Sequence, residues 1–128
     1  MDVTLKDLRL PGLWPASARP AMTILVGVYF FSHYLFASIT AHVTAMLPIM
    51  IAVGARTPGV PVEVFALLLA YTHGLMGVLT PYATTSGPVY LGSGYIGTGA
   101  FWRLGLLFGG IFLAALLLIA APILLWVG

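Results

Sequence analysis

Two clusters of hydroxyl side chains interrupt long apolar stretches of this chain. The segment FASITAHVTAMLPIM (36–50) places four polar side chains within seven residues, namely Ser38, Thr40, His42 and Thr44. The segment TPYATTSGP (80–88) holds three threonines, a serine and two prolines. Hydroxyls, together with the backbone N–H groups and positive dipole at the start of a helix, can hold an anion without a buried cation. The two clusters therefore predict binding of a carboxylate.

Each cluster also has a purely structural interpretation. Serine and threonine in membrane helices often hydrogen-bond a carbonyl four residues earlier or a neighbouring helix. The histidines His33, His42 and His73 lack the i, i+4 spacing of a helical metal site, which favours histidines that are hydrogen-bonded and packed between helices. Since His42 follows Thr40 by two residues, it is a possible substrate contact, and so is Ser86 in the second cluster.

The composition indicates which solvent surrounds these clusters. Of the 128 residues, 61% are hydrophobic and 6% are charged, whereas a soluble domain has about 25% charged residues. Residues 20–55, 64–102 and 104–128 contain no Asp, Glu, Lys or Arg. Each of these blocks can hold a helical membrane crossing, which needs about 20 apolar residues. The sequence therefore predicts an all-α, multi-pass integral membrane protein whose main surroundings are the lipid bilayer.

The two clusters divide the apolar chain into short elements. Residues 21–53 form either a re-entrant helical hairpin with its tip at 38–40 or one tilted helix of about 30 residues. In the hairpin, the second arm is expected to start at Ala41, with Thr40 near its N-cap. The full set of expected segments is an extramembrane lead-in (1–20), the hairpin (21–53), a polar turn (54–63), a broken transmembrane helix with 80–88 unwound (64–100), and a full C-terminal transmembrane helix (101–128).

Several function classes are not supported by the residues present. The chain has no cysteine, and therefore no disulfide framework or thiolate metal site. It shows no nucleophile–base pair, no paired carboxylates and no metal-ligand spacing, so that we expect no enzyme, no cofactor and no metal site. A net charge of +2 does not indicate a nucleic-acid partner.

The segments that contain the two clusters resemble a known protein family. HYLFASITAHVTAMLPIMIA (33–52) and GLMGVLTPYATTSGPVYLGSGYI (74–96) resemble the divalent-anion:sodium symporter (DASS) family, most closely its citrate/succinate and 2-oxoglutarate/malate exchanger branch. The likeness extends from about residue 21 to 127. It implies the C-terminal part of an inverted-repeat elevator transporter that works as a homodimer, in the bacterial inner membrane, on di- and tricarboxylates.

The resemblance also implies which residues bind substrate. The Ser-Asn-Thr signature of the family hairpin tip corresponds to Ser38, Ile39 and Thr40, and the family pattern Pro-x-Ala-Thr-Pro corresponds to a segment in which Thr85 replaces the second proline. In the family, these two segments hold a carboxylate and, in symporters, sodium. Ile39 cannot supply the amide oxygen that helps to ligate sodium, so that sodium-independent exchange is expected and a sodium-coupled symporter is the alternative. The implied substrate-binding set is Ser38, Ile39, Thr40, Ala83, Thr84 and Thr85.

Length is the second departure from the family. A full member is several times longer, and its first repeat supplies the other half of the site. The chain is therefore expected to need a missing N-terminal half before it can form a complete site. A truncated gene product, one piece of a split protein, and a small membrane protein that transports nothing are the alternatives.

Overall fold

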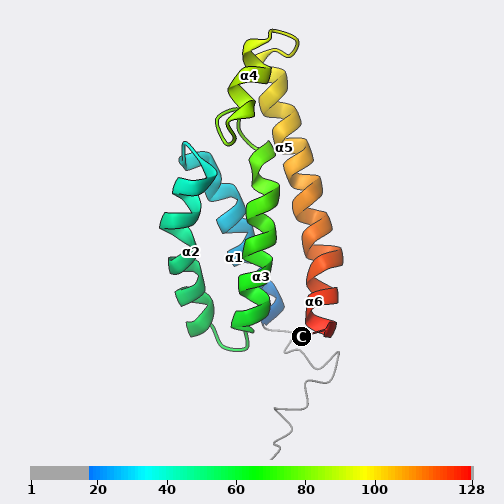
Figure 1. Cartoon of the computed structure of the whole chain (residues 1–128). Coiled ribbons are helices and arrows are strands. Elements are labelled where there is room, and N and C mark those ends of the chain that lie inside the picture. The colour runs from blue at the N-terminus through cyan, green and yellow to red at the C-terminus, as the bar shows by residue number, and fades with distance from the viewer. Residues whose placement is uncertain (1–17, 128) are drawn as a thin grey trace, which may run out of the picture.

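The computed structural model describes residues 18–127, and every regular element in that range is a helix. The helices are α1 (Ala18–Ser32), η1 (His33–Leu35), α2 (Ile39–Arg56), α3 (Val62–Leu75), η2 (Met76–Val78), α4 (Ser86–Gly92), α5 (Thr98–Ala115), η3 (Leu116–Ala120) and α6 (Ala121–Val127). Four longer helices, α1, α2, α3 and α5, stand side by side (Figure 1). At one end α5 extends past the other three, and α4 lies at that end, level with the first turns of α5. Most of the predicted lead-in lies outside the described residues, and α1 already begins within it.

α1 and α2 form a helical hairpin over residues 18–56, where 21–53 was expected, and the alternative of one unbroken helix is wrong. The turn that follows covers 57–61, whereas 54–63 was expected, because both flanking helices extend into that range. The backbone N–H of Phe36 donates to the carbonyl of His33 over 3.0 Å and closes the first arm. Ser38 is extended, and its hydroxyl accepts the backbone N–H of Ala41 over 3.1 Å. This bond satisfies one of the N–H groups that a helix start leaves without a partner. Ser38 is thus the N-cap of α2, so that the predicted start at Ala41 with Thr40 as cap is corrected.

The second interruption also lies close to its predicted place. Regular structure ends with η2 at Val78 and resumes with α4 at Ser86. Turn hydrogen bonds cross the gap, from the N–H of Ala83 to the carbonyl of Thr80 over 3.3 Å, and from that of Gly87 to Thr84 over 3.2 Å. The break therefore runs from 79 to 85, whereas 80–88 was expected, because the last three residues of that range are helical.

The C-terminal helix begins earlier than predicted and is not uniform. It starts at Thr98, three residues before the expected 101, and includes a π-helical turn, η3, before Pro122. Proline has no N–H and its ring collides with the carbonyl four residues earlier in a regular helix. A wider turn just before the proline is consistent with this clash, since π-bulges mark places where the regular bonding ladder is interrupted.

Glycines allow α5 to approach the break closely. A Cβ at Gly105 would lie 2.6 Å from the carbonyl oxygen of Val78 and 2.9 Å from that of Leu79. Only a residue without a side chain fits against these two carbonyls at the end of η2. Small residues that let backbones approach are a common means of packing helices in membranes. Gly105 therefore allows α5 to pack directly against the backbone at the start of the break.

Two stretches are long and apolar enough to cross a membrane by length and composition. They are Ile39–Arg56, with 18 residues, and Thr98–Leu124, with 27 residues. Val62–Val78 is apolar but shorter. The structure thus agrees with an all-helical membrane protein that has two candidate spans.

Candidate carboxylate-binding site

The hairpin tip and the break, which are about 45 residues apart in sequence, meet beside Gly77. A Cβ at Gly77 would lie 3.3 Å from Cδ1 of Ile39 and 3.2 Å from Cγ2 of Thr84. Figure 1 shows the turn before α2 next to the loop between α3 and α4. One residue of each cluster therefore packs close to Gly77, and each does so through an apolar carbon atom.

The hydroxyl-bearing residues of this region are largely exposed. Thr40, Thr84, Thr85 and Ser86 are exposed, and Ser38 is partly buried. The Oγ1 of Thr84 lies 3.2 Å from the Oγ of Ser86, where either hydroxyl can be the donor. Several hydroxyl donors and the start of α2 thus share one end of the bundle. A carboxylate accepts hydrogen bonds from such groups.

Three of the predicted site residues do not lie among the exposed hydroxyls. Ile39 is half-buried against Gly77, and Ala83 is buried, with 5% of its surface exposed. His42 is fully buried; its Nε2 lies 2.8 Å from the hydroxyl of Ser32, and its ring packs 4.6 Å from that of Tyr29. The structure therefore packs His42 between helices and does not place it among the exposed hydroxyls.

An aromatic group joins the tip, the break and α5. The hydroxyl of Tyr82 donates to the carbonyl of Tyr34 over 3.2 Å. Trp102 stacks on Tyr34 at a ring distance of 5.9 Å and meets Tyr82 edge-on at 5.9 Å. Sequence reasoning missed this group, because aromatic residues near a membrane surface usually indicate an interfacial anchor. It also missed Thr80, which is buried and whose Oγ1 has no hydrogen-bond partner in the part of the chain that the structure describes.

We expect Trp102→Ala to loosen the hairpin tip. The substitution removes two ring contacts, and aromatic pairs are each worth about 0.5–1.5 kcal/mol. Amide hydrogen exchange of residues 33–40 should become faster, in line with about 1–3 kcal/mol of lost local stability. Trp126→Ala is the matched control, since Trp126 is 70% exposed and its ring makes no contact with another aromatic ring of residues 18–127. Equal exchange at the tip in both variants would contradict this role.

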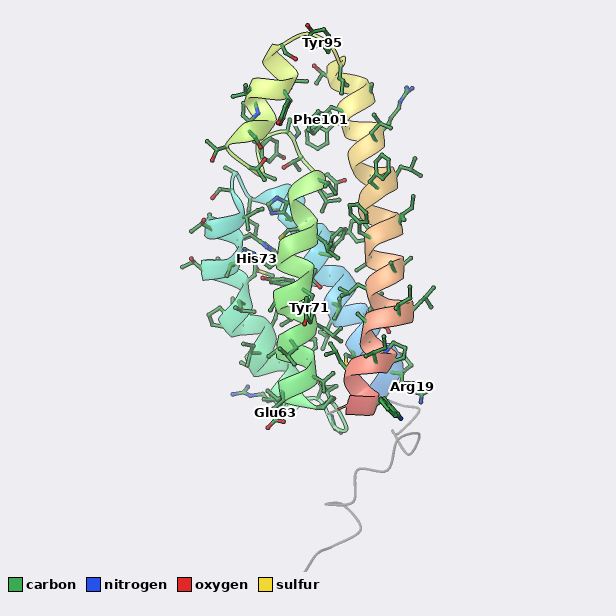
Figure 2. All side chains as sticks on the ribbon, turned by 45° about the vertical axis from the view of Figure 1, so that its right-hand side comes forward. Arg19, Glu63, Tyr71, His73, Tyr95 and Phe101 are labelled. Atoms are coloured by element: carbon green, nitrogen blue, oxygen red, sulfur yellow. The ribbon has the colours of Figure 1, made fainter. Side chains whose placement is uncertain are left out.

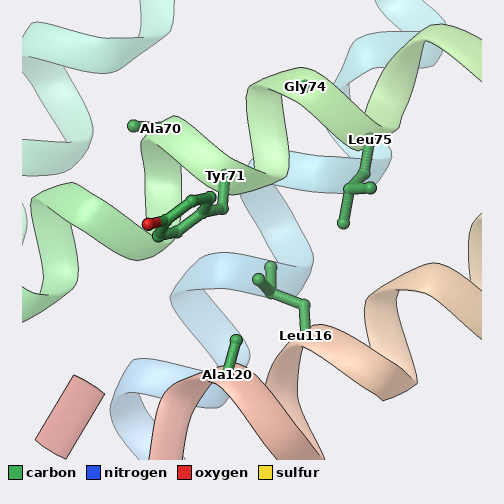
Figure 3. A pocket seen from close by; sticks show the side chains of 6 residues that line it. All are labelled: Ala70, Tyr71, Gly74, Leu75, Leu116 and Ala120. Carbon is green, nitrogen blue, oxygen red and sulfur yellow. The ribbon is translucent and has the colours of Figure 1, made fainter. Parts of the chain in front are cut away.

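An open apolar pocket lies elsewhere. It has a volume of about 370 Å³ between α3 and the C-terminal helix (Figure 3). Its lining is mainly apolar and comprises Ala70, Tyr71, Gly74, Leu75, Leu116 and Ala120. It contains none of the predicted site residues, and an apolar lining offers a carboxylate few hydrogen bonds. The exposed hydroxyls at the tip and the break are therefore the stronger candidate.

Known proteins resemble the chain over most of its length. Residues 11–127 match the family described as the sodium:sulfate symporter transmembrane region. The citrate/succinate antiporter of Escherichia coli (strain K12) is 48% identical over 108 residues, which are 84% of this chain and 22% of that protein. The L-tartrate/succinate antiporter of the same strain is 44% identical over 102 residues, which are 80% of this chain and 21% of that protein. No solved structure matches the chain.

Proposed function

The chain belongs to the sodium:sulfate symporter family of membrane transporters, and from this premise we propose that it is the C-terminal part of a carrier that exchanges di- and tricarboxylates across the bacterial inner membrane. The substrate class comprises citrate, succinate, malate and 2-oxoglutarate. The observation that supports this most is the meeting of tip and break at Gly77, in a chain whose relatives are named as citrate/succinate and L-tartrate/succinate antiporters.

In this proposal, the hairpin of α1 and α2 is re-entrant and the helix after it is broken within the membrane. α1 has 15 residues and α2 has 18. They reach about 22 Å and about 27 Å at 1.5 Å per residue, both less than the roughly 30 Å of the hydrocarbon core. Irregular backbone at membrane depth is tolerated only inside protein or beside a watery cavity, which suits the turn at 36–38 and the break at 79–85. The helix from Thr98 onward spans the bilayer and offers lipid its exposed apolar side chains, among them Leu104, Leu107, Ile111, Leu118, Ile119 and Ile123.

The carboxylate is held by neutral donors. Residues 20–55 and 64–102 contain no Lys or Arg, so neither the tip nor the break offers an ion pair from its own segment. Thr40, Thr84 and Thr85 donate hydroxyl hydrogen bonds, and the start of α2 adds N–H groups and its dipole. Ser38 supports the site by capping α2. Ser86 lies beside Thr84 and can add a further hydroxyl.

The chain spans about a fifth of the length of the curated relatives that it matches. The rest of the carrier supplies the other half of the carboxylate site in this proposal, and the complete protein works as a homodimer with an elevator movement. The alternative is that the chain acts on its own as a small membrane protein without transport. A transplantation experiment decides between the two.

The test is to let residues 21–127 replace the matching segment of the Escherichia coli citrate/succinate antiporter. The chimera is reconstituted in proteoliposomes loaded with succinate, and uptake of labelled citrate is measured. We expect exchange that requires internal succinate, because the transplanted segment supplies its half of the site. A chimera that folds in the membrane yet exchanges neither carboxylate would contradict the proposed function.

Exchange by this chimera is expected to be independent of sodium. Ile39 stands at the tip, where its side chain offers no oxygen to a cation, and hard cations such as sodium prefer several oxygen ligands. Replacement of sodium by potassium on both sides of the membrane should leave the initial uptake rate unchanged. Uptake that follows an imposed sodium gradient would instead favour the sodium-coupled symporter.

A further inference from the structure

Three histidines lie behind the hairpin tip, and most of their ring nitrogens have no hydrogen-bond partner within residues 18–127. His33 and His42 are fully buried, with ring centroids 5.4 Å apart at an angle of 73°. His73 lies on the side of α3 that faces α2 (Figure 2), and its Nδ1 is buried. The nitrogens without a partner are both of His33, Nδ1 of His42 and Nδ1 of His73.

Ser32 fixes the tautomer of His42. The hydroxyl of Ser32 donates to the carbonyl of Tyr29 over 2.8 Å, so that its single proton is already used. It therefore accepts the Nε2–H of His42, which lies 2.8 Å away. Nδ1 of His42 is left as a buried acceptor without a donor. An unsatisfied polar atom of this kind costs about 1–3 kcal/mol, and Nδ1 is the atom at which His42 can take up a proton.

We propose that His33, His42 and His73 form a proton-binding site, and that a proton held there and a carboxylate held at the hairpin tip stabilise each other. This inference rests on the proposed function and adds a coupled ligand to it. A metal ion is the less suitable occupant, since residues 18–127 contain no group of three histidine or carboxylate side chains that could hold one.

The coupling follows from where His42 lies in α2. Its backbone N–H donates to the carbonyl of Ser38 over 3.1 Å, which places it in the first turn of the helix. A positive charge there is opposed by the positive end of the helix dipole. A carboxylate bound at the same end offsets both the dipole and the charge on the imidazole. The anion therefore favours the proton, and the proton favours the anion.

Within residues 18–127, the surroundings of the cluster offer no other counter-ion. The ring of Tyr29 lies 4.6 Å from that of His42, and the apolar ring of Phe36 lies 4.9 Å from it. Glu63 is the only carboxylate side chain in residues 18–127. It lies in the first turn of α3, ten residues and therefore about 15 Å of helix before His73, and Figure 2 shows it at the opposite end of the bundle from the tip. The substrate is thus the available counter-ion.

The first experiment detects the proton while a carboxylate is bound, in a chimera with the Escherichia coli L-tartrate/succinate antiporter as host. The chimera is placed in lipid nanodiscs with saturating L-tartrate, and the ring nitrogens of His33 and His42 are followed by NMR from pH 8 to about pH 5. We expect the signals of His33 and His42 to change together, and His33→Gln to alter the titration of His42. Rings that stay neutral throughout, or that titrate independently of each other, would overturn the proton site.

The second experiment measures the coupling in a chimera with the Escherichia coli L-tartrate/succinate antiporter as host. Between about pH 6 and pH 8, the carboxylates of L-tartrate stay ionised, so a change in affinity reports on the protein. One linked proton should lower the half-saturating L-tartrate concentration by up to tenfold per pH unit of acidification. His42→Gln should flatten this dependence, whereas Thr44→Val, a neighbouring exposed change on α2, should keep it.

The outcomes separate the two proposals. Exchange of L-tartrate that is equally strong at both pH values, or a pH dependence that survives in His42→Gln, would overturn the linked proton while leaving the proposed function intact. A folded chimera without exchange at any pH would contradict the proposed function, and the coupling with it.

Discussion

Thr40→Val is expected to lower citrate/succinate exchange by the chimera by about 10- to 100-fold. The substitution preserves the shape of the side chain but removes a hydroxyl that donates to the carboxylate. A hydrogen bond to a charged group contributes about 1.5–3 kcal/mol, and 1.4 kcal/mol corresponds to a factor of ten. Thr40 is exposed at the start of α2, so that the folded structure does not depend on its hydroxyl. Initial rates of labelled citrate uptake into succinate-loaded proteoliposomes give the comparison.

Two further variants make this prediction specific. Thr44→Val changes a threonine one turn further along α2, whose hydroxyl donates to the carbonyl of Thr40 over 2.8 Å, and it should keep the exchange rate near that of the unmodified chimera. Thr84→Val should act as strongly as Thr40→Val, since both hydroxyls belong to the same site. Unchanged exchange in both Thr40→Val and Thr84→Val would exclude these hydroxyls from the site.

Gly87→Ala is expected to abolish most exchange, because the added Cβ displaces the backbone of the break. Gly87 is buried, and a Cβ at this position would overlap the carbonyl oxygen of Pro81. Backbone that is fixed by a proline cannot move aside as a flexible side chain can, so Thr84 and Thr85 must shift. Overpacking of this kind costs about 1–3 kcal/mol. The expected result is a lower Tm of the purified chimera together with lost exchange.

Gly92→Ala is the matched control for this substitution. Gly92 ends the same short helix, α4, and a Cβ there meets nothing within 4 Å. Both the Tm and the exchange rate should therefore stay close to those of the unmodified chimera. If Gly87→Ala behaves in the same way as Gly92→Ala, the break does not position the site as described.

The sequence was sufficient to predict the two interruptions, because each is a local pattern. Hydroxyls within an apolar run, and prolines with a glycine, indicate where a helix can stop without any knowledge of its neighbours. The exact cap was not predictable in this way, since Ser38 and Thr40 are both good N-cap residues. The structure selects Ser38, whose extended backbone leaves its hydroxyl free to accept the N–H of Ala41.

Contacts between distant segments were beyond sequence reasoning. Nothing local marks Gly77 as the residue at which Ile39 and Thr84 meet, because a lone glycine in a helix is compatible with many neighbours. The same holds for the bond between Ser32 and His42, which joins two arms only after the chain has turned. The family resemblance implied that tip and break share a site, whereas the packing that brings them together became visible only in the fold.

The most direct test of the central claim is whether a carboxylate protects the tip and the break from chemical modification. The chain has no cysteine, so single cysteines introduced as Thr40→Cys, Thr84→Cys and Ser93→Cys, in a cysteine-free host, can be labelled one at a time with a water-soluble thiol reagent. Ser93 is exposed just beyond α4 and serves as the control. We predict that citrate slows labelling at positions 40 and 84 and leaves position 93 unaffected. Labelling at 40 and 84 that is as fast with citrate as without it would contradict a carboxylate site at the hairpin tip and the break.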